Sequence, residues 1–206
     1  MSDLRRFIGM FVAWMLLLFA PSCARLERAV EKNARTRVGA GEETRDVTLL
    51  QGKVFDNADA NLTGGLSGRL SGGALGRALQ SQDEQYASTA RDYGYRPAEG
   101  IVVRIKDVAT DPCRVTSKEM VYLISRYALL APYRNKATVV REQWKITHKG
   151  QVVGTPVLTV ARTAGSWSSA LALRLPANPE TGAYQASVQI EAAGAKDRGM
   201  TTFTVG

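Results

Sequence analysis

The sequence predicts a mainly β protein, with a seven-stranded antiparallel sandwich in residues 97–206. Two observations lead to this fold class. Apolar and β-branched residues recur with a period of two in short runs, which gives each strand one apolar face. Turn-forming residues separate the runs at regular intervals, as is typical of antiparallel sandwiches. The expected strands are residues 100–108, 118–130, 137–147, 151–162, 167–176, 183–192 and 200–205.

The first 22 residues have the layout of an export signal. Arg5 and Arg6 give a positive start, residues 7–20 form a continuous apolar run, and small residues follow. The run is shorter than the roughly 20 apolar residues of a membrane span. We therefore expect residues 1–22 to be a signal peptide that is removed during export, with an uncleaved anchor helix as the alternative.

The end of this segment, residues 20–23, resembles the lipobox of bacterial lipoproteins. The resemblance implies that Cys23 is lipidated and that a membrane is its partner. Ala24 follows, where an aspartate would retain such a protein in the inner membrane, and this implies the outer membrane facing the periplasm. The chain has two cysteines, so lipidation leaves Cys113 alone. A Cys23–Cys113 disulfide is the alternative for a protein without lipid.

Residues 23–57 are polar and charged, and we expect a lipidated N-terminus that continues as a tether. In residues 58–96, glycine recurs at every fourth position from Gly64 to Gly76. At 3.6 residues per turn, this spacing forms one stripe on a helix. We therefore expect a helix over about residues 59–92. A flexible glycine-serine linker is the alternative, although a linker needs no period.

The glycine stripe resembles the glycine-zipper region of bacterial envelope lipoproteins. The resemblance implies membrane association or helix self-assembly, with a second copy of the chain or another envelope protein as the partner. Arg69 and Arg77 interrupt the apolar run, and a charge at the centre of a bilayer costs about 2.5–3.5 kcal/mol. A lone membrane-spanning helix is therefore unfavourable. Close helix packing remains the expected role of Gly64, Gly68, Gly72 and Gly76.

The predicted sandwich resembles the immunoglobulin-like domains of bacterial envelope proteins. Trp144 lies in the middle of the third expected strand, where such domains often bury a tryptophan. The sequence Gly182-Ala183-Tyr184 opens the sixth strand. The usual cysteine pair is absent, so the resemblance is to the variety without a disulfide. It implies that Trp144 and Tyr184 belong to the core.

The net charge and its distribution along the chain indicate what kind of partner the protein binds. The chain carries 27 lysines and arginines against 19 acids, a net charge of +8. Residues 97–206 hold 14 of these basic residues and 8 of the acids, a net charge of +6. In a cell envelope such a surface favours anionic lipid or glycan; an ordinary solvated basic surface is the alternative. We find no nucleic-acid-binding motif and expect no nucleic acid partner.

No group of residues suggests an active site. His148 is the only histidine in the sequence, and nothing pairs it with Cys113. We therefore expect no catalytic residues, no metal site and no cofactor. The sequence predicts a non-enzymatic bacterial envelope lipoprotein that is a structural or binding module. Cys23 anchors this module to the membrane, and the glycine helix mediates its assembly. The alternative is a soluble periplasmic or secreted protein that binds anionic lipid or glycan through its basic sandwich.

Overall fold

The computed structural model describes residues 48–50, 53–57 and 61–206, with side chains from residue 61 onward. The chain divides into two units, and all described residues lie in the second unit, Glu42–Gly206. The expected signal peptide and Cys23 therefore lie outside the described residues. Within the described part of the chain, no helix is long and apolar enough to cross a membrane.

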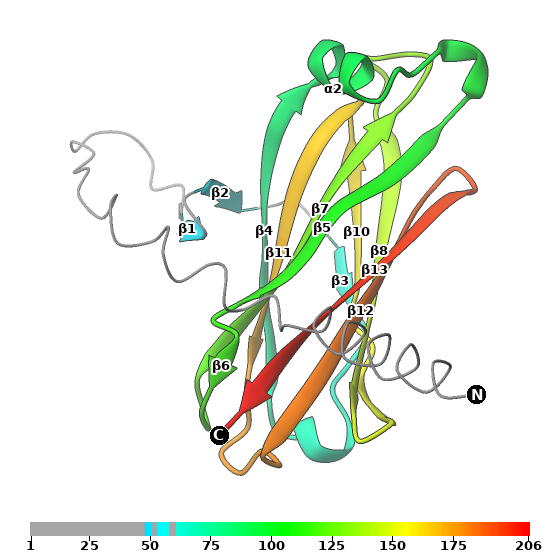
Figure 1. Ribbon diagram of the computed structural model, residues 1–206. Coiled ribbons are helices and arrows are strands. Elements are labelled where there is room, and N and C mark those ends of the chain that lie inside the picture. The colour runs from blue at the N-terminus through cyan, green and yellow to red at the C-terminus, as the bar shows by residue number, and fades with distance from the viewer. Residues whose placement is uncertain (1–47, 51–52, 58–60) are drawn as a thin grey trace, which may run out of the picture. The chain divides into compact units, whose positions relative to one another are not determined.

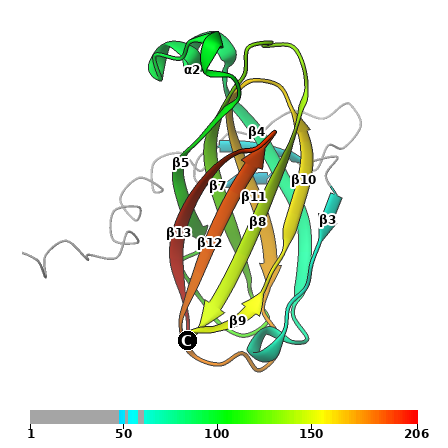
Figure 2. The same cartoon turned by 90° about the vertical axis from the view of Figure 1, so that its right-hand side faces the viewer.

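The described residues form two β-sheets that pack as a sandwich, which confirms the predicted mainly β fold class (Figure 1). The six-stranded sheet has the order β1-β2-β4-β11-β7-β5. The seven-stranded sheet has the order β3-β10-β8-β12-β13-β6, with β9 paired to β8, and it faces the viewer in Figure 2. Its β6 runs parallel to β13, whereas the other neighbouring strands are antiparallel.

The strands have the following bounds: β1 Thr48–Leu50, β2 Lys53–Asn57, β3 Asn61–Thr63, β4 Ala74–Gln85, β5 Val102–Asp111, β6 Arg114–Val115, β7 Met120–Leu130, β8 Thr138–His148, β9 Gln151–Gly154, β10 Val157–Arg162, β11 Gly165–Arg174, β12 Gly182–Ala192 and β13 Ala195–Val205. The helical segments are η3 Gly68–Leu70, α2 Tyr86–Asp92 and η4 Pro97–Glu99. All seven regions expected to be strands contain one. The expected strand 151–162 is divided into β9 and β10 at Pro156, which has no N–H to donate to a ladder.

The core lies between the two sheets and follows the predicted alternation. On β8, Val140, Trp144 and Ile146 face inward, and on β12 Tyr184 and Val188 do the same. Trp144 is 3% exposed and Tyr184 is fully buried, so the expectation that both belong to the core is confirmed. Burial of a large apolar side chain contributes about 1.5–3 kcal/mol, and the inward faces supply many of them.

A polar cluster lies inside this core and connects the two sheets. The side chains of Glu142 on β8 and Arg162 on β10 are completely buried and form an ion pair at 3.5 Å. Tyr127 on β7 accepts a hydrogen bond from Arg162 Nε at 2.8 Å and donates one to Glu142 Oε1 at 3.0 Å. Ser125 also donates to Glu142, at 3.2 Å. Burial, followed by the nearby Glu142 carboxylate, raises the pKa of Tyr127 well above its usual value.

The same arginine contacts two side chains of the six-stranded sheet. Arg162 donates from Nη1 to Gln80 on β4, and its guanidinium carbon lies 4.3 Å from the centre of the Trp167 ring on β11. Arg162 therefore joins an ion pair, hydrogen bonds and a cation–π contact in one buried position. These contacts offset much of the cost of removing the arginine charge from water, although Nη2 makes only the 3.5 Å ion pair with Glu142 and no hydrogen bond.

The expected helix of residues 59–92 is wrong. Among its described residues, only α2, Tyr86–Asp92, is α-helical, and Ala74–Gln85 forms the long strand β4. Strand β4 pairs with β11, and β3 pairs with β10. The sandwich therefore begins before residue 97, which corrects the expected boundary between a helical segment at 58–96 and the β domain.

The glycines of the stripe serve turns and close strand contacts in place of helix packing. Gly64, Gly68 and Gly72 have φ angles of +89°, +54° and +85°, values that an α-helix does not contain and that favour glycine. Gly76 lies in β4, where an added Cβ would come within 2.9 Å of the Ala172 Cβ on β11. The helix-packing role predicted for these four residues is therefore wrong. Their four-residue spacing arises from successive turns and one tight strand pair.

Candidate functional site

Strand register brings two segments together at one end of the sandwich. Gly165 of β11 pairs with Gln85 of β4 on one side and with Leu129 of β7 on the other. Both neighbours run antiparallel to β11. The C-terminal ends of β4 and β7 therefore lie at the same end of the sheet. The helix α2 follows β4, and the loop of residues 131–137 follows β7. Figure 1 shows this end, with α2 at the top of the view.

An open pocket lies between these two segments, and we call it the end groove. It has a volume of about 360 Å³ and is lined by Tyr86, Pro132, Tyr133, Arg134, Asn135 and Lys136. Tyr133 is 72% exposed, so its ring is available to a ligand. The pocket is widely open to solvent, so it suits a ligand that lies along the surface of the protein. Loops at the ends of sandwiches are common positions for binding residues.

The side chains of the end groove combine aromatic rings with positive charge. Arg134 and Lys136 are exposed, and no acid in the described part of the chain forms an ion pair with either of them. A guanidinium group binds carboxylate or phosphate in two-point geometry, and a lysine adds a point charge. Tyrosine rings offer rigid apolar faces with a polar tip. This combination suits a ligand that has both a ring and an acidic group.

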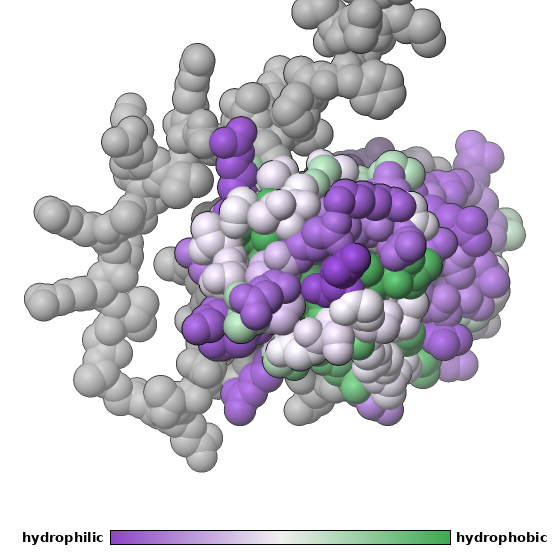
Figure 3. All heavy atoms as spheres, turned by 90° about the horizontal axis from the view of Figure 1, so that it is seen from below, coloured by the Kyte–Doolittle hydropathy of each residue, from purple (hydrophilic) through white to green (hydrophobic). Residues whose placement is uncertain are grey.

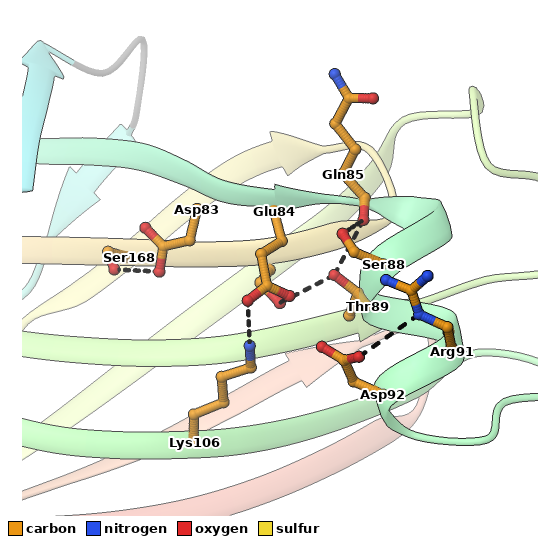
Figure 4. A network of polar contacts seen from close by, with 10 residues as sticks. Asp83, Glu84, Gln85, Ser88, Thr89, Arg91, Asp92, Lys106 and Ser168 are labelled. Atoms are coloured by element: carbon orange, nitrogen blue, oxygen red, sulfur yellow. Dashed lines mark hydrogen bonds and ion pairs between the residues drawn. The ribbon is translucent and has the colours of Figure 1, made fainter.

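A polar network fixes α2 against the sheet (Figure 4). The buried Thr89 hydroxyl of α2 lies 3.0 Å from the Ser166 hydroxyl of β11, and Ser166 donates to Glu84 at 3.4 Å. Lys106 of β5 contacts the same Glu84 carboxylate at 3.5 Å. Beside these contacts, the Ser168 hydroxyl of β11 donates to the Asp83 carboxylate of β4 at 2.7 Å. These contacts hold Tyr86, at the start of α2, in a fixed position relative to β11.

Two further contacts stiffen the segment after α2. The ring of Tyr86 packs edge-on against the ring of Tyr95, with centroids 6.4 Å apart, and Tyr95 donates to the Gly100 carbonyl at 2.6 Å. Burial, followed by the nearby Tyr86 and Glu99, raises the pKa of Tyr95. One wall of the end groove is therefore preorganised, which reduces the ordering cost of binding.

The only histidine in the sequence lies at the other end of β8. The His148 ring stacks on Tyr184 with centroids 4.2 Å apart, and its Nε2 lies 3.6 Å from the Glu180 carboxylate. Glu180 also binds Lys149 and, at 2.8 Å, Arg69. The hydrogen bond from Lys149, and to a smaller extent the charge of Arg69, lowers the pKa of Glu180. These ion pairs connect η3 to the turn before β12.

Hydrophilic side chains cover much of the surface at this lower end, with small hydrophobic areas between them (Figure 3). Cys113 lies in the turn between β5 and β6 and is a partly buried free cysteine. Cys23, the predicted lipidation site, lies outside the described residues. Within the part of the chain that the structure describes, no cluster of His, Cys, Asp and Glu has the geometry of a metal site.

The end groove was not among the sites predicted from sequence. The loop contributes Tyr133, Arg134 and Lys136 within four residues, and this mixture of aromatic and basic residues between two strands is a local signal. Tyr86 gives no such signal, because it reaches the loop only through the pairing of β4 with β11. The misassigned helix over residues 59–92 concealed that pairing.

No family model matches the chain, and no curated protein matches it. Solved structures with partial similarity to the chain include an alkylpurine DNA glycosylase from Pseudomonas fluorescens, at 16% identity over 52% of this chain and 31% of that chain, with a TM-score of 0.37. A β-glucosidase from Listeria innocua is 14% identical over 52% of this chain and 16% of that chain, with a TM-score of 0.35. The chain therefore spans less than a third of the length of either protein.

A conjugative transposon lipoprotein from Bacteroides eggerthii is also among the partly similar structures. It is 14% identical over 53% of this chain and 98% of that chain, with a TM-score of 0.29. At these identities and scores, none of the three similarities assigns a function to this chain.

Proposed function

We propose that this chain is a non-enzymatic binding module of a bacterial cell envelope that binds an acidic glycan in its end groove. The observation that carries the proposal is the lining of the groove, where Tyr86 and Tyr133 lie beside Arg134 and Lys136. Aromatic rings stack on sugar rings through their apolar faces, and the two cations pair with carboxylate or phosphate groups. The basic excess of residues 97–206 supports an anionic partner.

We also propose that the sandwich is of the immunoglobulin-like class. Two features support this. Trp144 is buried on β8 and pairs in register with Val188 on β12. The Tyr184 hydroxyl donates to the Glu180 carbonyl at 2.8 Å, which is the arrangement of a tyrosine corner at the start of strand F. In such domains the loops at one end form the binding surface, and the end groove occupies that kind of position.

Binding of an acidic polysaccharide tests the groove. We expect the full chain to retain polygalacturonate, a polymer of uronic acid, and not neutral dextran. Replacement Arg134→Glu is expected to weaken polygalacturonate binding at least tenfold, because a hydrogen bond to a charged group contributes about 1.5–3 kcal/mol. Tyr133→Ala is expected to weaken it several-fold through lost stacking. Affinity measured by calorimetry at about 0.1 M salt checks both variants.

The control is Arg174→Glu, which makes the same charge change at the exposed opposite end of β11. It is expected to alter affinity less than threefold, because salt screens charges that lie more than about 10 Å apart. Equal losses for Arg134→Glu and Arg174→Glu would contradict a groove and leave only a general charge effect.

We propose that Cys23 carries the lipid and holds the module at the outer membrane, facing the periplasm. The lipobox resemblance of residues 20–23 supports this proposal. Replacement Cys23→Ser is expected to move the protein from the membrane fraction to the soluble fraction of cells washed with high salt. The high-salt wash removes electrostatic attachment, so the remaining membrane fraction reports the lipid. A membrane fraction that the substitution leaves unchanged would refute the anchor.

A further inference from the structure

The exposed face of the seven-stranded sheet carries a group of positively charged residues that are not part of the end groove. On β8, β12 and β13, inward residues alternate with outward ones, and most outward residues are polar; Val139 and Met200 are exposed apolar exceptions. Its cations are Arg141 and Lys145 on β8, Lys196 and Arg198 on β13, and Arg114 on β6 in register with Thr204. All five are exposed. We call this outward surface the basic face.

Few acids balance these cations. Glu191 on β12 is the outward acid of the same strands, and it pairs with Lys196 at 3.4 Å. Arg198 donates to the amide of Gln189 at 2.7 Å, a contact that leaves its charge in place. The outward side of the six-stranded sheet differs, because there Arg126 pairs with Asp107 at 2.8 Å and Lys106 with Glu84 at 3.5 Å. The positive excess is therefore local to one face.

The cations are distributed along the whole face. Register places Arg141 opposite Glu191, Gln189 opposite Arg198, and Lys145 opposite Ser187, in successive cross-strand rows. Rows that are two residues apart are separated by about 6.6 Å. Arg114 lies beside Thr204, two rows beyond the row of Lys145, so the charges extend over roughly 26 Å. A distribution of this kind suits an extended anionic surface better than a single small ligand.

The remaining outward side chains indicate which anionic surface this is. Apart from the apolar Val139 and Met200, they are amides, hydroxyls and small residues, with no aromatic ring among the outward positions of β8, β12 and β13. Sugar-ring stacking, which the end groove offers, is therefore missing from this face. Short neighbours such as Ser187 and Thr202 leave the long cationic side chains free to extend outward. Met200, 65% exposed, adds an apolar side chain that can enter the headgroup region.

We infer that the basic face docks on a bilayer that contains anionic lipid, an interaction that goes beyond the glycan binding proposed for the end groove. Each lysine or arginine near an anionic bilayer strengthens association about fivefold at low salt. The attraction decays within a Debye length, about 10 Å at 0.1 M salt. The face therefore acts only when it lies against the membrane, and a lipid on Cys23 would hold it near enough to do so.

The test compares two triple variants of the full chain that carry the same net charge. The face variant is Arg141→Gln, Lys145→Gln and Arg198→Gln. The control variant is Arg91→Gln, Arg104→Gln and Arg174→Gln, which removes three exposed cations from other surfaces. Co-sedimentation is measured with phosphatidylcholine vesicles that contain or lack phosphatidylglycerol. The ratio of the two partition coefficients reports the electrostatic part of binding, because the apolar N-terminal run contributes to both.

We expect this ratio to be about a hundredfold lower for the face variant than for the unmodified protein, because each of the three cations contributes about fivefold. The ratio is expected to fall less than fivefold in the control variant. For the unmodified protein, high salt should bring the ratio close to one. Equal losses in both triple variants, or an unchanged ratio in the face variant, would overturn the proposal. So would a face variant that loses polygalacturonate binding while it keeps the vesicle ratio. Arg134→Glu is expected to spare the vesicle ratio, so the two proposals fail separately.

Discussion

Replacement Arg162→Met is expected to lower the free energy of unfolding by about 3–5 kcal/mol, the usual cost of removing one partner from a buried ion pair. The Glu142 side chain is completely buried, and without Arg162 its charge has no compensating cation among the described core residues. The Tyr127 hydroxyl and the Gln80 amide also lose their donor. Urea unfolding of the full chain, followed by circular dichroism, measures the change.

Two further variants separate the buried pair from a general effect of arginine loss. Arg141→Met removes an exposed arginine from neighbouring β8 and is expected to change stability by less than about 0.5 kcal/mol. The double variant Arg162→Met with Glu142→Leu is expected to be at least about 1 kcal/mol more stable than Arg162→Met alone, because it leaves no buried charge uncompensated. A loss below 1 kcal/mol for Arg162→Met would contradict the buried cluster.

The cluster also explains why a sequence with one apolar face per strand contains charged residues on that face. Glu142 lies between Val140 and Trp144 on the inward side of β8, and strand alternation alone places it in the core. Alternation does not identify its partner. Arg162 lies 20 residues away in sequence, at the last position of β10, and only the pairing of β10 with β8 brings both residues to the same interior.

Apart from the two-residue β6, the strands of residues 97–206 were predictable because each one carries its own signal. Period-two apolar patterns and adjacent turns are local, and they located strands such as β8 and β12 to within one residue of their observed bounds. The prediction that Trp144 and Tyr184 are buried rested on the same local pattern. The antiparallel sandwich followed from the number and spacing of the strands.

Strand β4 and the end groove depend on contacts that are distant in sequence. The segment of β4 contains Gly76 and Arg77 and ends in a polar run, so its alternation is weak. Its strand conformation comes from pairing with β11, about 90 residues later, with two register irregularities on the way. Four-residue glycine spacing gave a stronger local signal for a helix, and tertiary pairing overrode it.

Replacement Gly64→Ala is expected to destabilise the full chain by about 2–4 kcal/mol. Gly64 has a φ of +89°, and an added Cβ would lie 2.2 Å from the Thr155 carbonyl oxygen. A left-handed conformation costs an L residue about 1–2 kcal/mol, and overpacking adds about 1–3 kcal/mol. Urea unfolding provides the measurement. The matched control is the neighbouring Gly65→Ala, where an added Cβ meets no atom within 4 Å, and it is expected to change stability by less than about 1 kcal/mol.

The same pair of variants distinguishes a turn from a zipper helix by the kind of change that results. In a helix, Gly65→Ala would stabilise by about 1 kcal/mol through propensity, and Gly64→Ala would act mainly on self-association. A turn at Gly64 instead predicts a loss of unfolding free energy that does not vary with protein concentration, because the clash with Thr155 lies within one chain. A gap between the unfolding midpoints of Gly64→Ala and the unmodified protein that widens as concentration rises would contradict the turn and restore the zipper.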